Sequence, residues 1–369
     1  MEKLISNWSN IKSVPENYIF PLESRPGDLK IPTSNSIPII DLKADSDRAN
    51  TIHQIIKAAQ EFGFFQQSLI SFLWLKQVIN HGILENEMKE TMSVFKEVFQ
   101  MSDEYKQKLY LDDDLKTCKR FTSSLRYETE NVHLWRDSLR HPAHPLEDWQ
   151  HLWPENPTEY RECVGNFSVK IKELGSRIMD LISEGLGLKC GYFDNDLTGS
   201  LIISINHYPP CPEPSLTLGL SKHKDPYLIT ILMQDGVSGL QVLKDGKWIT
   251  VEPLPHAFVI NIGHLLEVHL IDFLIHNMDQ IHLVQIISKG KLKSAEHRAV
   301  TNSSQTRTSA AFFIAPSDDC LIEPAQDLTH YENNQPILRS FKYKEFLKNF
   351  FDTLGDTDLI LKSFEPPKN

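Results

Sequence analysis

The sequence has no run of Lys and Arg residues and no apolar stretch long enough to cross a bilayer. Its 369 residues carry a formal net charge of −11, so the basic surface that nucleic-acid binding requires is not expected. The most apolar stretches, 64–75 and 265–287, are short or interrupted by Asp, Asn and His, which argues against a membrane span. The N-terminus lacks a basic segment followed by an apolar one, which argues against a secretory signal.

Cysteine is scarce, and its spacing matches no metal or redox motif. No two cysteines form a Cys-x-x-Cys pair, and an odd number cannot pair completely: Cys118, Cys163, Cys190, Cys211 and Cys320. This usage predicts reduced thiols in a cytoplasmic protein rather than a disulfide framework or a zinc site.

The residues that could carry chemistry lie in a stretch from 221 to 309. His223 and Asp225 are two apart in a segment that reads as one strand, 223–233, so their side chains are expected to leave from one face. His297, from a later strand, can complete a set of three. Two His and one carboxylate with open positions opposite form the ligand set of oxygen-activating non-haem Fe(II). A His-x-Asp pair alone is common by chance, so the prediction depends on the second His and on the residues C-terminal to it.

Arg307 and Ser309 lie shortly after the second His and are again two apart. On a strand they would project toward the same cavity as the three predicted ligands. Arg is suited to holding a carboxylate through two parallel hydrogen bonds, so a carboxylate-bearing ligand is expected here.

Several longer motifs accompany these residues: Asn206-His207-Tyr208-Pro209-Pro210-Cys211-Pro212, Gly239-Leu240-Gln241-Val242, Asp245-Gly246-Lys247-Trp248 and His297-Arg298-Ala299-Val300-Thr301-Asn302. Together they resemble the plant 2-oxoglutarate- and Fe(II)-dependent dioxygenases of small-molecule metabolism, with hyoscyamine 6-dioxygenase-like and flavanone 3-dioxygenase-like members the most similar branches. The resemblance extends from about residue 15 to about residue 351.

The resemblance implies an enzyme that uses Fe(II), O2 and 2-oxoglutarate, with ascorbate as reductant. It implies that 2-oxoglutarate binds the metal and that its distal carboxylate meets Arg307, with Ser309 and Tyr208 donating hydroxyl hydrogen bonds. The substrate would be a small plant specialised metabolite such as an alkaloid, a flavonoid or a phenolic acid. It would contact residues 121–135 and the pair Phe312–Phe313. An oxidase of the same fold that does not use 2-oxoglutarate is the alternative.

Hydrophobic periodicity predicts an α+β fold with a double-stranded β-helix (jelly roll) core, a helical N-terminal region and a C-terminal helix. We expect four segments: a flexible arm over 1–36, a helical region over 37–198, the jelly-roll domain over 199–318, and a C-terminal helix and tail over 319–369. The predicted helices cover 45–62, 85–101, 159–188 and 343–354, and the predicted strands cover 37–42, 201–207, 223–233, 240–243, 248–251, 257–262, 297–302 and 308–314.

Two stretches interrupt the family pattern, at 67–77 and 269–285, and neither has clear turn chemistry. They are interpreted as translated intron, with a substrate-covering loop as the competing interpretation of the first. If the second spoils strand pairing, His297 is displaced and the chain is inactive. In addition, His264 stands where the family usually has Asp, so one local polar contact is expected to be missing.

Lys224 lies between two predicted ligands on the expected strand, so its side chain is expected to face outward. The protein is expected to be a monomer. Two groups of histidines are not expected to bind metal, one in a proline-rich exposed loop and one in the second interruption: His141, His144 and His151, and His269, His276 and His282.

Overall fold

The computed structural model describes residues 4–8, 11–27, 38–42, 47–67, 81–111, 120–124, 127, 130–267, 292–322, 339–353 and 356–365. The stretches 68–77 and 269–285, which include three of the histidines discussed above, lie outside these residues, as does Cys118. The helices of the described part are α1 Arg48–Glu61, α2 Glu85–Gln100, α3 Asp103–Leu111, α4 Leu146–Trp149, α5 Tyr160–Gly185, α8 Tyr343–Asp352 and α9 Thr357–Ser363, with short 3-10 helices at Ile5–Asn7, Glu16–Tyr18, Leu22–Ser24, Gln150–Leu152 and Asn195–Thr198.

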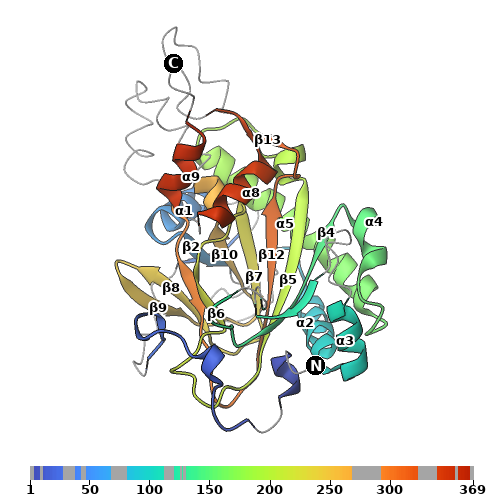
Figure 1. Cartoon of the computed structure of the whole chain (residues 1–369). Coiled ribbons are helices and arrows are strands. Elements are labelled where there is room, and N and C mark those ends of the chain that lie inside the picture. The colour runs from blue at the N-terminus through green and yellow to red at the C-terminus, as the bar shows by residue number, and fades with distance from the viewer. Residues whose placement is uncertain are drawn as a thin grey trace, which may run out of the picture.

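Two β-sheets form the centre of the molecule (Figure 1). The eight strands of the large sheet are, in spatial order, β1 Ile39–Ile40, β2 Phe64–Gln67, β10 Phe258–Ile262, β7 Ile229–Gln234, β12 Arg307–Ala315, β5 Ser200–Tyr208, β4 Asp137–His144 and β3 Arg120–Ser123. The small sheet contains β6 Leu220–His223, β11 His297–Ala299, β8 Leu240–Lys244 and β9 Lys247–Val251, and β13 Leu321–Ile322 pairs with β14 Phe341–Lys342.

The two sheets pack face to face through apolar side chains. Leu240 and Val242 of β8 belong to one buried cluster with Phe64 of β2 and Val259 of β10. Every pairing in the large sheet is antiparallel except that of β1 with β2. This double-sheet arrangement confirms the predicted jelly roll.

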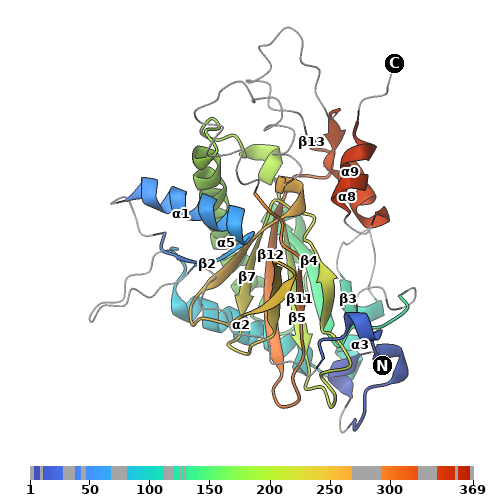
Figure 2. The same cartoon turned by 90° about the vertical axis from the view of Figure 1, so that its left-hand side faces the viewer.

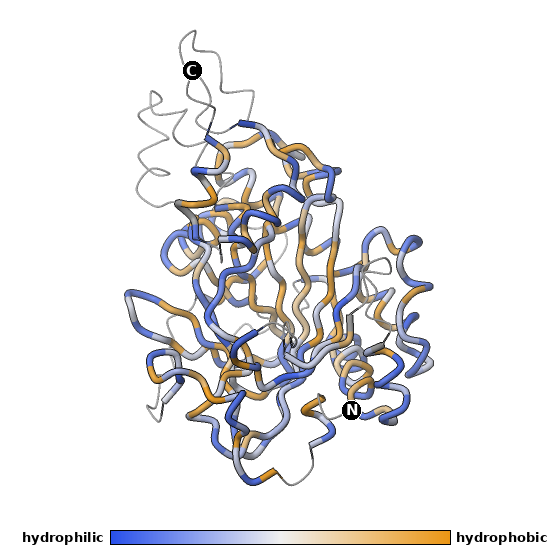
Figure 3. The backbone as a smooth tube through the Cα atoms, viewed as in Figure 1, coloured by the Kyte–Doolittle hydropathy of each residue, from blue (hydrophilic) through white to orange (hydrophobic). Residues whose placement is uncertain are grey.

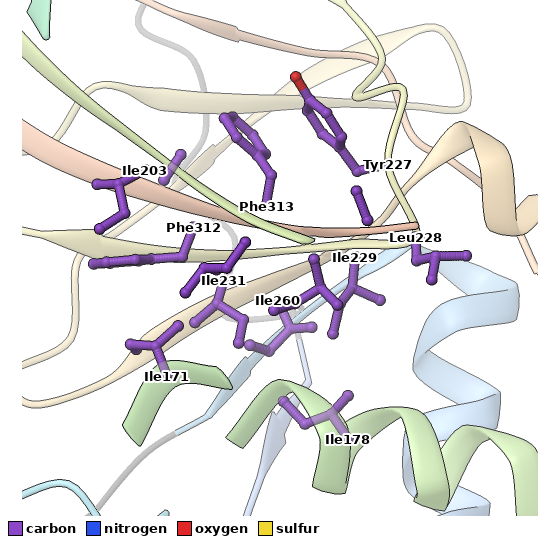
Figure 4. Close-up of a cluster of buried hydrophobic side chains, with 14 of the residues drawn as sticks. Ile171, Ile178, Ile203, Tyr227, Leu228, Ile229, Ile231, Ile260, Phe312 and Phe313 are labelled. Atoms are coloured by element: carbon purple, nitrogen blue, oxygen red, sulfur yellow. The ribbon is translucent and has the colours of Figure 1, made fainter. Parts of the chain in front are cut away.

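Helix α5 covers the outer face of the large sheet, as the turned view shows (Figure 2). Ile171 and Ile178 of α5 point at Ile231 and Ile260 on the strands, and all four side chains are fully buried (Figure 4). Each such burial contributes roughly 1.5–3 kcal/mol to folding. The backbone coloured by hydropathy shows the same pattern, with the central strands mostly apolar and the surrounding loops mostly polar (Figure 3).

The predicted helices agree with the structure apart from their exact ends. α1 ends at Glu61, and Gly63 follows with a φ of +67°, a left-handed conformation that glycine adopts without steric cost. The chain then enters β2, whose last residue, Gln67, pairs with Ile40 and Phe258. The first residue of the predicted interruption at 67–77 is therefore part of the sheet.

The prediction of a flexible arm over 1–36 is wrong for the described residues of this segment. Ile5 and Tyr18 are buried, and the backbone amides of Ile5 and Ser6 donate hydrogen bonds of 3.0 and 2.7 Å to the carboxylate of Asp137. Trp8 packs edge-on against Trp135 at 5.8 Å between ring centroids. These aromatic and apolar contacts attach the N-terminal segment to β4 although its composition is polar.

The exposed loop predicted around His141 is also wrong, because this residue lies in β4. His141 is 1% exposed, and one of its ring nitrogens lies 2.7 Å from the hydroxyl of Tyr160. The residue therefore links β4 to α5, because Tyr160 is the first residue of that helix.

Within the described part of the chain, no helix combines the length and the apolar character that crossing a membrane requires.

Candidate active site

The structure brings together the three side chains predicted to bind a metal. His223 is the last residue of β6 and His297 the first of β11, and the two are directly opposite each other in the small sheet. Asp225 lies in the connection from β6 to β7. Its Oδ1 is 3.5 Å from Nε2 of His223 and 3.7 Å from Nε2 of His297. Potential ligand atoms of the three residues all lie within 4.8 Å of one another.

The sequence predicted that one strand brings His223 and Asp225 together, and this explanation is partly wrong. The predicted strand 223–233 is two strands, because β6 ends at His223 and β7 begins at Ile229. Asp225 is held instead by its backbone carbonyl, which accepts a 2.7 Å hydrogen bond from the amide of His264. The side chain of His264 is buried, with Nδ1 2.8 Å from Glu267 and Nε2 without a hydrogen-bond partner among the described residues, so the position keeps one polar contact and lacks another. Lys224 does not simply face outward, since it lines the cavity beside the triad and donates a hydrogen bond to Glu267.

Backbone carbonyls orient both imidazoles. Nδ1 of His223 lies 2.8 Å from the carbonyl oxygen of Ser221, and Nδ1 of His297 lies 3.2 Å from that of Ala295. A carbonyl only accepts hydrogen bonds, so each Nδ1 carries the proton and each Nε2 presents a lone pair to the centre of the triad. This is the outer support that metal-binding histidines commonly have.

The two carboxylate oxygens of Asp225 have different roles: one accepts hydrogen bonds from the protein, and the other faces the two imidazoles. Oδ2 accepts hydrogen bonds of 2.7 Å from the hydroxyl of Thr230 and 2.6 Å from the side-chain amide of Asn261, while Oδ1 faces the imidazoles. Thr230 and Asn261 were not predicted. A signal existed, because Asn261 is the single polar residue of β10 and Thr230 stands between apolar residues in β7.

The electrostatics of the triad favour the protonation states that bind a cation. Burial alone would raise the pKa of Asp225, but the neighbouring His297 and His223 and the Thr230 hydrogen bond hold that pKa well below its usual range. Burial, reinforced by His223, lowers the pKa of His297 to about 4. Near neutral pH the set therefore offers an ionised carboxylate and neutral imidazole, which fits a divalent non-haem iron.

Arg307 occupies the second part of the site, on β12. It is 2% exposed, and its guanidinium donates to the side chain of Gln234 at 2.9 Å, to the hydroxyl of Ser309 at 3.3 Å and to the carbonyl of Val237 at 3.2 Å. Tyr208 of β5 is the direct cross-strand partner of Arg307, with its ring centroid 5.1 Å from the guanidinium carbon. The three residues predicted to hold a distal carboxylate are thus neighbours.

Gly239 leaves the space that Arg307 occupies. A Cβ atom at this position would lie 2.7 Å from Cδ of Arg307, which is closer than carbon atoms pack. The sequence motif that includes Gly239 was noted only for its resemblance, so this role in packing was missed.

The triad and Arg307 line one cavity of about 790 Å3, a volume typical of small-molecule sites. Of the residues predicted to contact a substrate, Thr122 and Phe313 line this cavity. Phe312 does not, because alternation along β12 turns its ring to the opposite face, toward α5 (Figure 4). The lining also includes Arg136 and Arg140, which were not predicted.

Comparison with known proteins supports the same interpretation. Residues 199–316 match the family model of the 2OG-Fe(II) oxygenase superfamily, and residues 37–156 match the model described as non-haem dioxygenase in morphine synthesis N-terminal. Protein DOWNY MILDEW RESISTANCE 6 of Arabidopsis thaliana is 40% identical, and the match covers 98% of both chains. Hyoscyamine 6-dioxygenase of Hyoscyamus niger is 38% identical over 99% of both chains.

Among solved structures, the crystal structure of JOX2 in complex with 2OG, Fe and JA resembles this chain with a TM-score of 0.76. The two are 32% identical, and the match covers 98% of this chain and 96% of that one.

Proposed function

The chain belongs to the 2OG-Fe(II) oxygenase superfamily, and we propose that His223, Asp225 and His297 are its iron ligands. The protein is an Fe(II)- and 2-oxoglutarate-dependent dioxygenase, as its relatives are. The observation that carries the assignment of residues is the position of the triad and of Arg307 on one cavity.

We assign the distal carboxylate of 2-oxoglutarate to Arg307, Ser309 and Tyr208. Arg307 is held by three acceptors, one on each guanidinium nitrogen, so its position does not depend on the ligand. A preorganised guanidinium can form two charge-assisted hydrogen bonds to a carboxylate without losing further side-chain entropy. Ser309 and Tyr208 then add hydroxyl groups from the same face of β12 and β5.

Iron with 2-oxoglutarate supplies the oxidising power, using O2 and converting the co-substrate to succinate and CO2 while a substrate C–H bond is oxidised. The protein's own contribution is to orient the two ligands and the substrate and to keep bulk water away. Thr230 and Asn261 fix the Asp225 carboxylate for this purpose, and ascorbate would keep the iron reduced.

The proposed substrate is a small plant specialised metabolite. The relatives include enzymes named for hyoscyamine and flavanone, and one solved structure contains JA. The cavity volume suits a molecule of that size.

We also propose that the protein acts as a cytoplasmic monomer, without nucleic-acid or membrane partners. The described cysteines are all free thiols, and two of them are buried, which suits a reducing compartment. Microscopy of a fluorescent fusion protein tests the cytoplasmic location. Light scattering, which gives the molar mass in solution, tests the monomeric state.

An inactive product of a chain with two insertions is disfavoured by one observation. His297 keeps its register with His223 on one side and Val242 on the other, so the displacement expected of a disruptive insertion is not seen. The alternative, an oxidase of the same fold that does not use 2-oxoglutarate, does not explain why a guanidinium held by three acceptors lines the same cavity as the triad.

Succinate release from labelled 2-oxoglutarate tests the residue assignments. We expect His297→Ala to abolish Fe(II)-dependent turnover, because only two ligands remain. Arg307→Lys should raise the KM for 2-oxoglutarate by about 10- to 100-fold, since a point charge cannot form the two-pronged contact. Asp319→Ala, which removes an exposed carboxylate paired with Lys342 and Lys344, is the control and should be unchanged. Undiminished turnover in either site variant would exclude the role assigned to that residue.

A further inference from the structure

The cavity is lined by more cationic side chains than iron and 2-oxoglutarate need. Most of them already have a partner. Lys222 lies 3.0 Å from Glu296 and Lys224 lies 3.1 Å from Glu267, while Arg307 is assigned to 2-oxoglutarate. Arg298 packs over the ring of Trp248 and bonds to Gln241. Two guanidinium groups, those of Arg136 and Arg140, are left.

Both of these arginines have neutral partners. Arg140 donates a 2.6 Å hydrogen bond to the hydroxyl of Tyr227, and Arg136 donates one of 2.7 Å to the side-chain oxygen of Asn206. Nε of Arg136 is buried without an acceptor. Glu130 acts on Arg136 only through its charge and is itself 2.9 Å from His133. Among the described residues, no carboxylate forms an ion pair with either guanidinium.

Strand geometry places both groups in the same cavity as the triad. Arg140 belongs to β4 and pairs with Ser204 of β5, while Arg136 directly precedes β4, and both side chains line the cavity. The guanidinium carbon of Arg140 lies 5.2 Å from the ring centroid of Phe313, and Tyr227 packs 4.3 Å from the same ring. Figure 4 shows Phe313 and Tyr227 together on the face of the sheet away from α5. Tyr227 is two residues after Asp225.

Arg136 is buried and feels the charge of Arg140, and a buried charge beside a like charge is unfavourable unless an anion compensates it. The co-substrate does not supply that anion, because one of its carboxylates is assigned to Arg307 and the other to the metal. A third carboxylate would be held best by Arg140, which is only partly buried and whose guanidinium lies against Phe313.

We propose that the oxidised substrate is an anionic metabolite, whose carboxylate pairs with Arg140 and whose flat apolar body packs on Phe313. The proposal rests on the proposed function and narrows it. A carboxylic acid would bind well, a neutral flavanone more weakly, and a cationic alkaloid worst, because the two arginines repel it. Arg140 is thus a specificity-determining residue rather than one needed for iron or 2-oxoglutarate.

The test uses matched acids and amides, which differ in charge but hardly in shape. Probes are salicylic acid with salicylamide and 4-coumaric acid with 4-coumaramide, and naringenin serves as a neutral flavanone. Succinate formation is measured for the full-length protein with Fe(II), ascorbate and 2-oxoglutarate. At least one acid should stimulate succinate formation with a kcat/KM about 10- to 100-fold above that of its amide.

Three variants then assign the preference to one residue. Arg140→Gln can still donate a hydrogen bond to Tyr227 and should abolish the preference for the acid, while Arg140→Lys keeps the charge and should restore part of it. Arg48→Gln removes an exposed guanidinium paired with Glu184 and should keep the full preference. Unchanged preference in Arg140→Gln would overturn the proposal, as would the absence of any preference for acid over amide in the wild-type protein.

A binding measurement separates this proposal from the proposed function. Calorimetry with Mn(II) in place of iron follows 2-oxoglutarate and each probe without turnover. If 2-oxoglutarate fails to bind the wild-type protein, the proposed function fails, whereas the acid–amide comparison can still be made. If 2-oxoglutarate binds but naringenin binds better than both acids, the proposed function stands and the anionic substrate is excluded.

Discussion

The two faces of the large sheet are built from the same strands and carry different chemistry. On β12, Phe312 and Ile314 point to the helical side, where apolar side chains fill the space against α5 and Ile314 reaches Gly175 of that helix. Arg307, Ser309 and Phe313 alternate with them and face the cavity. On the helical side the requirement is volume, and neighbouring side chains can adjust. On the cavity side the requirement is that single polar atoms lie within hydrogen-bonding distance of one another, so small changes there affect function before stability.

The pair Phe312 and Phe313 tests this difference most strongly. Phe312→Ala should lower the free energy of unfolding by about 3–5 kcal/mol, because it leaves a closed cavity in the core. Phe313→Ala opens into an existing cavity, so it should cost clearly less stability and instead raise the KM for substrate. Urea unfolding and steady-state kinetics on both variants measure the two effects. Equal losses of stability would contradict the distinction between the faces.

Thr230 and Ile231, neighbours on β7, provide a second matched pair. Thr230→Val keeps the volume but removes one hydrogen bond to Asp225, and we expect about tenfold weaker metal binding, since Asn261 still holds the carboxylate. Ile231→Val lies on the face toward α5 and should cost about 0.5–1.5 kcal/mol of stability with metal affinity unchanged. Titration with Mn(II) separates them. Equal metal affinities in the two variants would show that Thr230 has no part in holding the ligand.

The smallest expected effect concerns His207, the one ionisable side chain of β5 that alternates to the helical side. Its ring stacks on Phe99 of α2 at 4.6 Å between centroids, and burial lowers its pKa to about 4. In the unfolded chain the His207 side chain takes up a proton near pH 6.5, whereas in the folded chain it does so only near pH 4. Stability contributed by neutral His207 is therefore complete above pH 6.5 and is lost as the pH falls toward 4.

His207→Phe should flatten that part of the stability curve, because Phe can stack on Phe99 and does not titrate. Thermal unfolding of wild type and variant between pH 4 and 7 measures the change. A curve of the same slope in both proteins would assign the acid sensitivity to other groups, such as His81, whose pKa burial also lowers to about 4.

Local sequence rules were sufficient where one element contains the whole pattern. The spacing of Arg307 and Ser309 placed both on one face of β12, and the structure agrees. The same rule applied to His223 and Asp225 gave the correct neighbours for the wrong reason, because the chain leaves the strand after His223. A backbone hydrogen bond from the amide of His264 to the carbonyl of Asp225 holds Asp225 beside His223 instead. The sequence contains no local signal for a bond between segments so far apart.

Long-range packing also explains the other errors. Polar composition predicted a flexible N-terminal arm, but Ile5, Trp8 and Tyr18 reach the buried surface around Trp135. The prolines near His141 predicted a loop, yet that residue lies in a strand and bonds to α5. In each case a few buried contacts outweigh the average character of the segment.

By itself the sequence determined the alternation of each strand, the helix periods and the identity of the ligand-type residues, because these depend on neighbours along the chain. Only the tertiary structure decided which residues share the cavity, since sheet order joins β4, β5, β12 and β7 across large separations in sequence. That order places Arg140 beside Phe313 and sets Thr230 and Asn261 behind Asp225. The energy of a buried charge or hydrogen bond depends on such neighbours in space.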